Sequence, residues 1–166
     1  MPLSSCYIVS QLNGNVIDIR EASIQPGTAA DAYPLKQSGA SNQVWTFVPD
    51  PTGSGYFFIQ SVLGYYLVLE IRNASNEPGA TLDVNLANTA GQTAHQLWTF
   101  FADPAGSGYC YILSKLNGYA LDIAEASTAP GAALDVFPRK VNGTSNQLWT
   151  VVAGETALQA AGEKSA

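Results

Sequence analysis

The stretch SNQVWTF occupies residues 41–47, and close copies of it stand at 94–100 (AHQLWTF) and 145–150 (SNQLWT). The motif Gln-x-Trp is therefore written three times, with 53 and then 51 residues between successive tryptophans. A motif that returns at a nearly constant spacing indicates a fold assembled from repeated units. We expect the three tryptophans to be structural, because a large ring at the end of an apolar strand fills the space between neighbouring units.

Other markers recur in the same order along the chain. Residues 6–23 align without gaps on residues 110–127 with most positions identical, whereas the middle copy at 55–70 has diverged. A Pro-Gly pair follows each copy, at Pro26-Gly27, Pro78-Gly79 and Pro130-Gly131. The chain thus divides into repeats of roughly 50 residues, about 6–54, 55–107 and 108–153, and a tail, 154–166, that we expect to be frayed or used in packing.

The pattern inside each repeat is that of short strands. Apolar runs alternate with turns, and Asn13-Gly14 between two such runs is a strong hairpin signal. This predicts four strands per repeat and an all-β fold, a β-trefoil of three four-stranded repeats forming one domain over residues 6–153. A propeller of three blades would fall below the usual minimum of four, and a sandwich would not explain the three-fold spacing.

Composition and charge exclude several classes of function. The 166 residues are 46% hydrophobic and 12% charged, and the net charge of −6 with scattered basic residues argues against a nucleic-acid partner. No apolar run approaches the ~20 residues that span a bilayer, and the N-terminus lacks the pattern of a signal peptide. We therefore expect no membrane insertion, and a cytoplasmic protein or one secreted by a non-classical route.

Cys6 and Cys110 hold equivalent positions in two repeats, too far apart for a disulfide, so free thiols are expected.

The three Gln-x-Trp motifs, the strand count and the segment after each Pro-Gly turn resemble the ricin B-chain type (R-type) lectins, over residues 6–152. In that family a repeat holds a shallow sugar pocket made of an aspartate after the first turn, an aromatic residue two strands later and the Asn-Gln pair of the motif. A second aspartate, two residues before the aromatic one, points to the same face of its strand. The resemblance assigns these roles to Asp18, Asp31, Tyr33, Asn42 and Gln43 in the first repeat, and to Asp122, Asp135, Phe137, Asn146 and Gln147 in the third.

The second repeat departs from this pattern. Val68 falls where the aspartate is expected, Asn85 or Leu86 is nearest to the aromatic position, and His95 replaces the asparagine. We expect no working pocket in this repeat and a structural role for His95.

The residue types of the two predicted pockets suit a pyranose. A carboxylate accepts hydrogen bonds from two neighbouring hydroxyls, asparagine donates and accepts, and an aromatic ring packs on the C–H face of the sugar. Galactose and N-acetylgalactosamine fit best, since the axial 4-hydroxyl leaves such a face free. Gln43 and Gln147 are expected to orient the aspartates. In an alternative interpretation Asp18 and Asp122 only cap tight turns.

Catalysis finds little support in the sequence. The chain has one histidine, no His/Cys cluster for a metal and no sign of a cofactor, and a shallow wet pocket would not supply the raised pKa that glycoside hydrolysis by Asp18 and Asp31 requires. The alternative is a β-trefoil protease inhibitor that acts through exposed loops, here 20–27 and 72–79.

One departure from the secreted ricin-like chains concerns the disulfide that staples each of their repeats. The matching positions carry no cysteine; they are Val16 with Leu35 and Ala120 with Arg139. The resemblance is thus to the disulfide-free branch of fungi and bacteria, in which defence is a common role. The sequence leaves a homodimer open.

Overall fold

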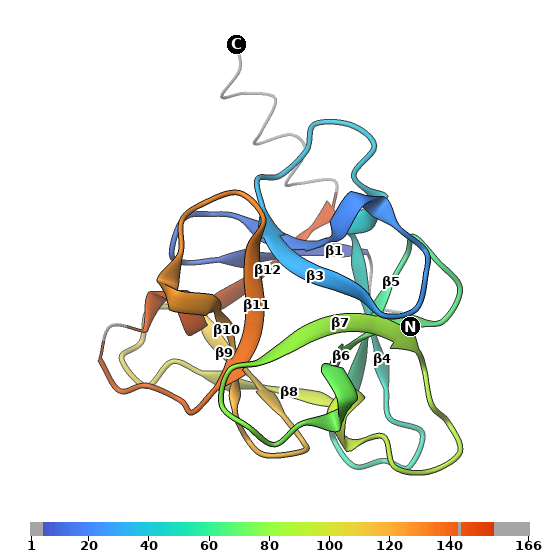
Figure 1. Ribbon diagram of the computed structural model, residues 1–166. Helices are drawn as coiled ribbons and strands as arrows, with labels where there is room; N and C mark the ends of the chain where they lie inside the picture. The colour runs from blue at the N-terminus through green and yellow to red at the C-terminus, as the bar shows by residue number, and fades with distance from the viewer. Residues whose placement is uncertain (1–4, 143, 155–166) are drawn as a thin grey trace.

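The computed structural model describes residues 5–142 and 144–154, and these contain twelve strands, four from each repeat (Figure 1). The first repeat contributes β1 (Cys6–Ser10), β2 (Val16–Ile19), β3 (Thr28–Tyr33) and β4 (Trp45–Pro49). The second contributes β5 (Phe57–Ser61), β6 (Leu67–Ile71), β7 (Ala80–Leu86) and β8 (Trp98–Ala102). The third contributes β9 (Cys110–Ser114), β10 (Ala120–Ile123), β11 (Ala132–Phe137) and β12 (Trp149–Ala153).

The strands pair with three-fold regularity. The last strand of each repeat pairs with the first strand of the next, as β4 with β5 and β8 with β9, and β12 returns to β1 to close the ring. The second and third strands form hairpins, β2–β3, β6–β7 and β10–β11. The third strands, β3, β7 and β11, also pair with one another and outline the central triangle of Figure 1. The predicted all-β trefoil of three four-stranded repeats is confirmed.

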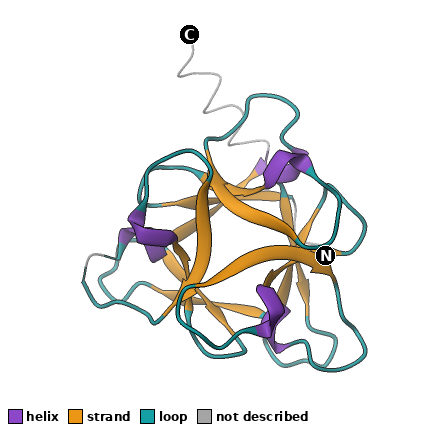
Figure 2. Ribbon diagram, viewed as in Figure 1, coloured by secondary structure: helices purple, strands orange, loops and turns teal. Residues whose placement is uncertain are grey.

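Two short 3₁₀ turns in each repeat position the predicted pocket residues (Figure 2). One follows the second strand: η1 (Arg20–Ala22), η3 (Arg72–Ala74) and η5 (Ala124–Ala126). The other precedes the last strand: η2 (Ser41–Gln43), η4 (Ala94–Gln96) and η6 (Ser145–Gln147). The Gln-x-Trp motif thus begins as a turn and continues as a strand, so its polar residues face the hairpin while its tryptophan enters the core.

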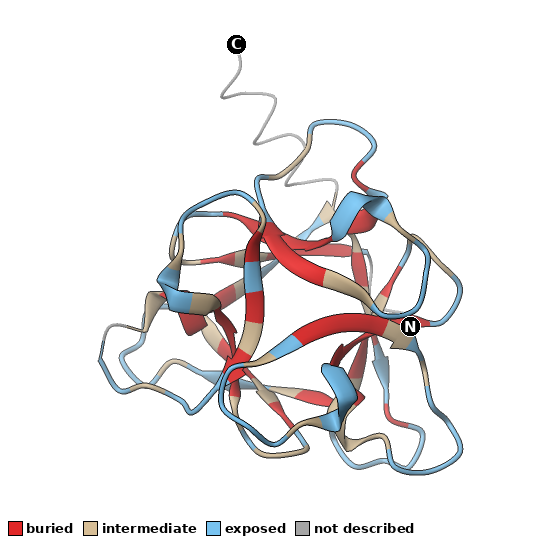
Figure 3. Ribbon diagram, in the orientation of Figure 1, coloured by how far each residue is buried: buried red, intermediate tan, exposed pale blue. Residues whose placement is uncertain are grey.

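The core lies inside the barrel and takes side chains from all three repeats (Figure 3). Trp45, Trp98 and Trp149 are fully buried, and each indole Nε1–H donates to a main-chain oxygen of the second strand, that of Ile17, Leu69 and Leu121, at 3.0, 3.1 and 3.0 Å respectively. A buried indole that pairs its N–H gains packing energy without leaving a donor unsatisfied. The predicted structural role of the tryptophans is confirmed.

The two cysteines are free, as expected, and hold matching positions. The thiol of Cys6 donates to the main-chain oxygen of Trp45 at 3.3 Å, and that of Cys110 to Trp149 at 3.4 Å. Burial raises the pKa of Cys6 to about 11, so this thiol is unreactive.

Within the described part of the chain no helix is long and apolar enough to cross a membrane. The tail beyond residue 154 lies outside the described residues.

Candidate functional site

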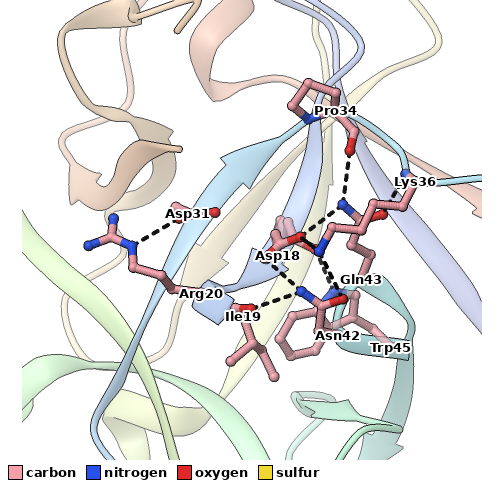
Figure 4. A network of polar contacts seen from close by, with 10 residues as sticks. Asp18, Ile19, Arg20, Asp31, Pro34, Lys36, Asn42, Gln43 and Trp45 are labelled. Atoms are coloured by element: carbon pink, nitrogen blue, oxygen red, sulfur yellow. Dashed lines mark hydrogen bonds and ion pairs between the residues drawn. The ribbon is translucent and has the colours of Figure 1, made fainter. Parts of the chain in front are cut away.

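Four of the predicted residues of the first repeat, Asp18, Asp31, Asn42 and Gln43, lie together at one hairpin (Figure 4). Asp18 on β2 pairs in register with Asp31 on β3, and Tyr33 lies two residues further along β3 on the same face. Turn η2 brings Asn42 and Gln43 against this pair. The pairing of β2 with β3 and the turn η2 therefore bring together Asp18 and Gln43, which are 25 positions apart in sequence.

Asp18 forms the buried floor of this cluster. Its Oδ1 accepts a hydrogen bond from Asn42 Nδ2 at 2.8 Å, and its Oδ2 accepts one from Gln43 Nε2 at 2.8 Å. The same two amides also donate to the main-chain oxygens of Ile19 and Pro34, at 2.9 and 3.0 Å. Gln43 therefore fixes the orientation of Asp18, and Asp18 lies within a strand rather than at a turn, so the turn-cap interpretation is wrong.

Lys36 is a member of the cluster that sequence reasoning missed. Its Nζ lies 3.2 Å from Asp18 Oδ2, donates to Asn42 Oδ1 at 3.2 Å and stands 5.5 Å from the centre of the Tyr33 ring. The ring and the ammonium reach solvent, since Tyr33 is 40% and the Lys36 side chain 34% exposed, whereas the Asp18 side chain is only 3% exposed. A lysine three residues after the aromatic residue, in YPLK and FPRK, is the sequence signal that would have identified it.

The third repeat reproduces this arrangement closely. Asn146 Nδ2 and Gln147 Nε2 each donate to Asp122 at 2.8 Å, and Lys140 Nζ lies 3.4 Å from the same carboxylate. Phe137 is 39% exposed, with Lys140 Nζ 5.4 Å from the centre of its ring. Burial raises the pKa of Asp122, although the hydrogen bond from Gln147 and the charge of Lys140 oppose the rise.

In the second repeat Glu70, and not Val68, occupies the position of the pocket aspartate. Val68 pairs with Asn85 as Val16 pairs with Tyr33, and Val68 is fully buried. The stretch from the first strand to the second is one residue longer in the second repeat, from Gln60 to Val68, than in the first, from Val9 to Val16, and this accounts for one of the two positions that separate Val68 from Glu70. Asp18, Glu70 and Asp122 each stand eight residues before the proline of a Pro-Gly turn, so counting back from that turn would have found Glu70.

The carboxylate of Glu70 is held by different partners from those of Asp18. Gln96 Nε2 donates to its Oε2 at 2.7 Å, Asn85 Nδ2 donates to its Oε1 at 3.1 Å, and His95 Nε2 lies 3.3 Å from Oε2. Asn85 takes the place of the aromatic ring. Asn88 takes the place of the lysine, because its main-chain N–H donates to Gln96 Oε1 at 2.8 Å as that of Lys36 does to Gln43. The absence of a working pocket here stays a prediction, which now rests on Asn85 and Asn88.

Each repeat has a second aspartate on its third strand, which is Asp31, Asp83 or Asp135. The first two of these are paired with an arginine. Arg20 Nε donates to Asp31 Oδ2 at 3.1 Å, and Arg72 Nε donates to Asp83 Oδ2 at 2.9 Å. These contacts also tie the starts of loops 20–27 and 72–79 to the barrel. In the third repeat Ala124 stands at the position of Arg20 and Arg72, so Asp135 has no arginine from this position.

The described residues contain no group of three or more histidine, cysteine, aspartate or glutamate side chains that could hold a metal ion. What the two clusters offer instead is a flat ring, a lysine ammonium and a hydrogen-bonded carboxylate side by side. These groups can pack against and hydrogen-bond a neutral polyhydroxyl ligand.

A family model described as ricin-type beta-trefoil lectin domain-like matches residues 4–85, 41–137 and 94–163. A comparison with curated proteins gave no match. Among solved structures, the designed three-fold symmetric protein ThreeFoil is 29% identical, with a TM-score of 0.77 over 89% of this chain and 97% of that one.

Two natural lectins share the fold at lower identity. A ricin B-like lectin of the fungus Macrolepiota procera, solved in complex with lactose, is 24% identical, with a TM-score of 0.69 over 89% of this chain and 93% of that one. The C-terminal half of an earthworm R-type lectin, solved with GalNAc, is 21% identical, with a TM-score of 0.66 over 89% of this chain and 97% of that one.

Proposed function

Because the chain belongs to the ricin-type β-trefoil lectin domain-like family, it is a carbohydrate-binding protein and not an enzyme, and we propose that it binds galactose or N-acetylgalactosamine through two pockets. The first pocket comprises Asp18, Asp31, Tyr33, Lys36, Asn42 and Gln43, and the third pocket comprises Asp122, Asp135, Phe137, Lys140, Asn146 and Gln147. The inhibitor alternative is not favoured by the family.

The observation that carries this proposal is a half-exposed aromatic ring beside a lysine and a clamped aspartate, present in two repeats and absent from the other. Packing alone would conserve the buried Gln-x-Trp motif in all three repeats, and it does so. It would not place rings that are 40% and 39% exposed at Tyr33 and Phe137 while Asn85 stands in the second repeat. An exposed ring next to paired charges is typical of a site that recognises a ligand.

The chemistry of the first pocket suits a pyranose with one flat face. Tyr33 would pack against the C–H groups that the axial 4-hydroxyl of galactose leaves on one side, burying apolar surface at about 25 cal/mol per Å². Lys36 would donate to a hydroxyl, and Asp18 would accept from one; a hydrogen bond to a charged group contributes about 1.5–3 kcal/mol. The lactose and GalNAc bound by the two natural lectins are consistent with this choice of sugar.

Each proposed pocket offers a monosaccharide one ring and a few polar groups, so each would hold it weakly. A ligand of about a dozen atoms at roughly −0.3 kcal/mol per atom binds with a Kd near the millimolar range. Two such pockets on one rigid body would raise avidity on a surface rich in glycans by about 10²–10⁴. The proposed target is therefore a multivalent glycoconjugate.

The test is a glycan array followed by calorimetry with galactose, N-acetylgalactosamine and lactose. Tyr33→Ala combined with Phe137→Ala should abolish binding, and the rings are the right targets because loss of Asp18 would also leave the amides of Asn42 and Gln43 unsatisfied. Tyr65→Ala is the matched control, since Tyr65 is 92% exposed and lies in neither pocket. Binding that survives the double substitution would refute the proposal, as would an array without any galactose-type ligand.

A further inference from the structure

The proposed third pocket lacks a positive charge that the first pocket has. Asp18 and Asp31 are matched by Lys36 and Arg20, so the ionised first pocket is neutral (Figure 4). Asp122 and Asp135 are matched by Lys140 alone, because Ala124 stands where Arg20 stands in the first repeat. With both aspartates ionised, the third pocket would carry one uncompensated negative charge.

Among the described residues, no other group packed against Asp135 supplies the missing charge. β10 places Asp122 directly opposite it, β7 places the uncharged Thr81 opposite it, and η5, which packs against β11, begins with Ala124. The segment after β11 contributes Lys140, whose ammonium lies against Asp122. β3 pairs with the start of β11, where Asp31 lies opposite Ala133 and is already ion-paired with Arg20.

The carboxyl group of Asp135 is also poorly hydrogen-bonded. Among residues 5–142 and 144–154 its buried Oδ1 has no hydrogen-bond partner. The Oδ1 atoms of Asp31 and Asp83 are likewise unpartnered, so the arginine on Oδ2 is what distinguishes those two carboxylates from Asp135. A buried carboxyl group that faces another carboxylate without a cation retains its proton more readily.

We infer that the two proposed pockets differ in protonation, so that the third binds sugar more weakly as the pH rises above neutrality while the first does not. This rests on the proposed function. A sugar on Phe137 covers Asp135, which lies two residues earlier on the same face of β11, and removes water from it. A protonated Asp135 tolerates that loss of water, whereas an uncompensated carboxylate opposes it.

The protonation behaviour agrees with this geometry. Burial, and then the charge of Asp122, raise the pKa of Asp135 to about 7, although the charge of Lys140 opposes the rise. Burial also raises the pKa of Asp31, but the hydrogen bond from Arg20 opposes that rise.

The sugar experiment uses variants with one pocket each. Tyr33→Ala leaves the third pocket and Phe137→Ala leaves the first, and each is titrated with N-acetylgalactosamine by NMR at pH 5.5 and pH 8.5. The third pocket should lose about tenfold in affinity at the higher pH if sugar raises the pKa of Asp135 by about one unit, and the first pocket should hold its affinity. Adding Ala124→Arg to Tyr33→Ala should remove the pH dependence. A third pocket whose affinity is constant or rises with pH overturns the inference.

A second measurement separates this inference from the proposed function. The side-chain carboxyl carbon of Asp135 is followed by NMR in the sugar-free protein, with Asp135→Asn to assign the signal. A midpoint near neutrality that Ala124→Arg moves to acidic pH supports the inference, and an acidic midpoint in the unsubstituted protein overturns it. If no sugar binds at any pH, the proposed function fails, while the carboxyl titration still decides the protonation.

Discussion

Asp135 couples the stability of the whole protein to pH. Because its folded pKa of about 7 lies above the value near 4 of an unfolded chain, the folded state binds more protons than the unfolded state between these two values. Its contribution to the free energy of unfolding is therefore largest below about pH 4 and falls as the pH rises to about 7. This behaviour is the reverse of that of a salt-bridged aspartate.

Asp135→Asn should raise the free energy of unfolding by about 1–2 kcal/mol at pH 8 and should change it little at pH 4. The effect at pH 8 is well below the free energy that corresponds to the full pKa difference, because the group is partly solvated. Urea unfolding at the two pH values measures this difference. Asp31→Asn is the matched control, since Arg20 opposes the rise in the pKa of Asp31 and this substitution should therefore stabilise the protein at pH 8 by less than Asp135→Asn does. An Asp135→Asn protein that is less stable at pH 8 would contradict the assignment.

The turn that opens each Gln-x-Trp motif has a structural role in all three repeats. Only in the first and third repeats is it also part of a proposed pocket. Gln96 is buried and joins Glu70, the main-chain oxygen of Leu86 and the main-chain N–H of Asn88, although the second repeat has no exposed ring. Gln43 and Gln147 make the same three kinds of contact. The glutamine thus holds the loop before the motif against the hairpin in every repeat.

Gln96→Ala should therefore lower the free energy of unfolding by about 1–3 kcal/mol, because it leaves a buried carboxylate, a carbonyl and an N–H with fewer partners. Sugar affinity at both proposed pockets should be unchanged. Chemical denaturation and a sugar titration of the same sample check the two statements together. A protein that loses sugar binding without losing stability would show that the second repeat takes part in recognition.

The strands and their order could be predicted from the sequence better than the side-chain contacts between them. The repeated Gln-x-Trp and Pro-Gly pairs sufficed for the trefoil, because turn chemistry and strand alternation are local. Glu70 was missed by two positions, one of which comes from an extra residue in the turn before β6, because a count along the sequence carries every such shift forward. Lys36 and Lys140 were missed because the lysine shared by YPLK and FPRK was not used as a marker, and its contact with the carboxylate on the second strand is visible only in the fold.

At the scale of the molecule, the two proposed pockets belong to separate repeats and share no residue. Phe137→Ala should therefore leave the monosaccharide Kd of the first pocket unchanged and halve the stoichiometry seen by calorimetry. Binding to a dense glycan surface should fall by about 10²–10⁴, because simultaneous engagement is lost. Surface plasmon resonance at high and low glycan density measures the effect. An equal loss at both densities would mean that the pockets do not act together.

Closure of the barrel by β1 and β12 has a consequence for the order of events during synthesis. Of the twelve described strands β1 leaves the ribosome first, yet its partner along residues Cys6–Ser10 is β12, which leaves last of the twelve. At about 5–20 residues per second, roughly 7–30 seconds pass between them. Over that interval one edge of a growing ring stays open, and a chaperone or a neighbouring nascent chain would meet that edge before β12 does.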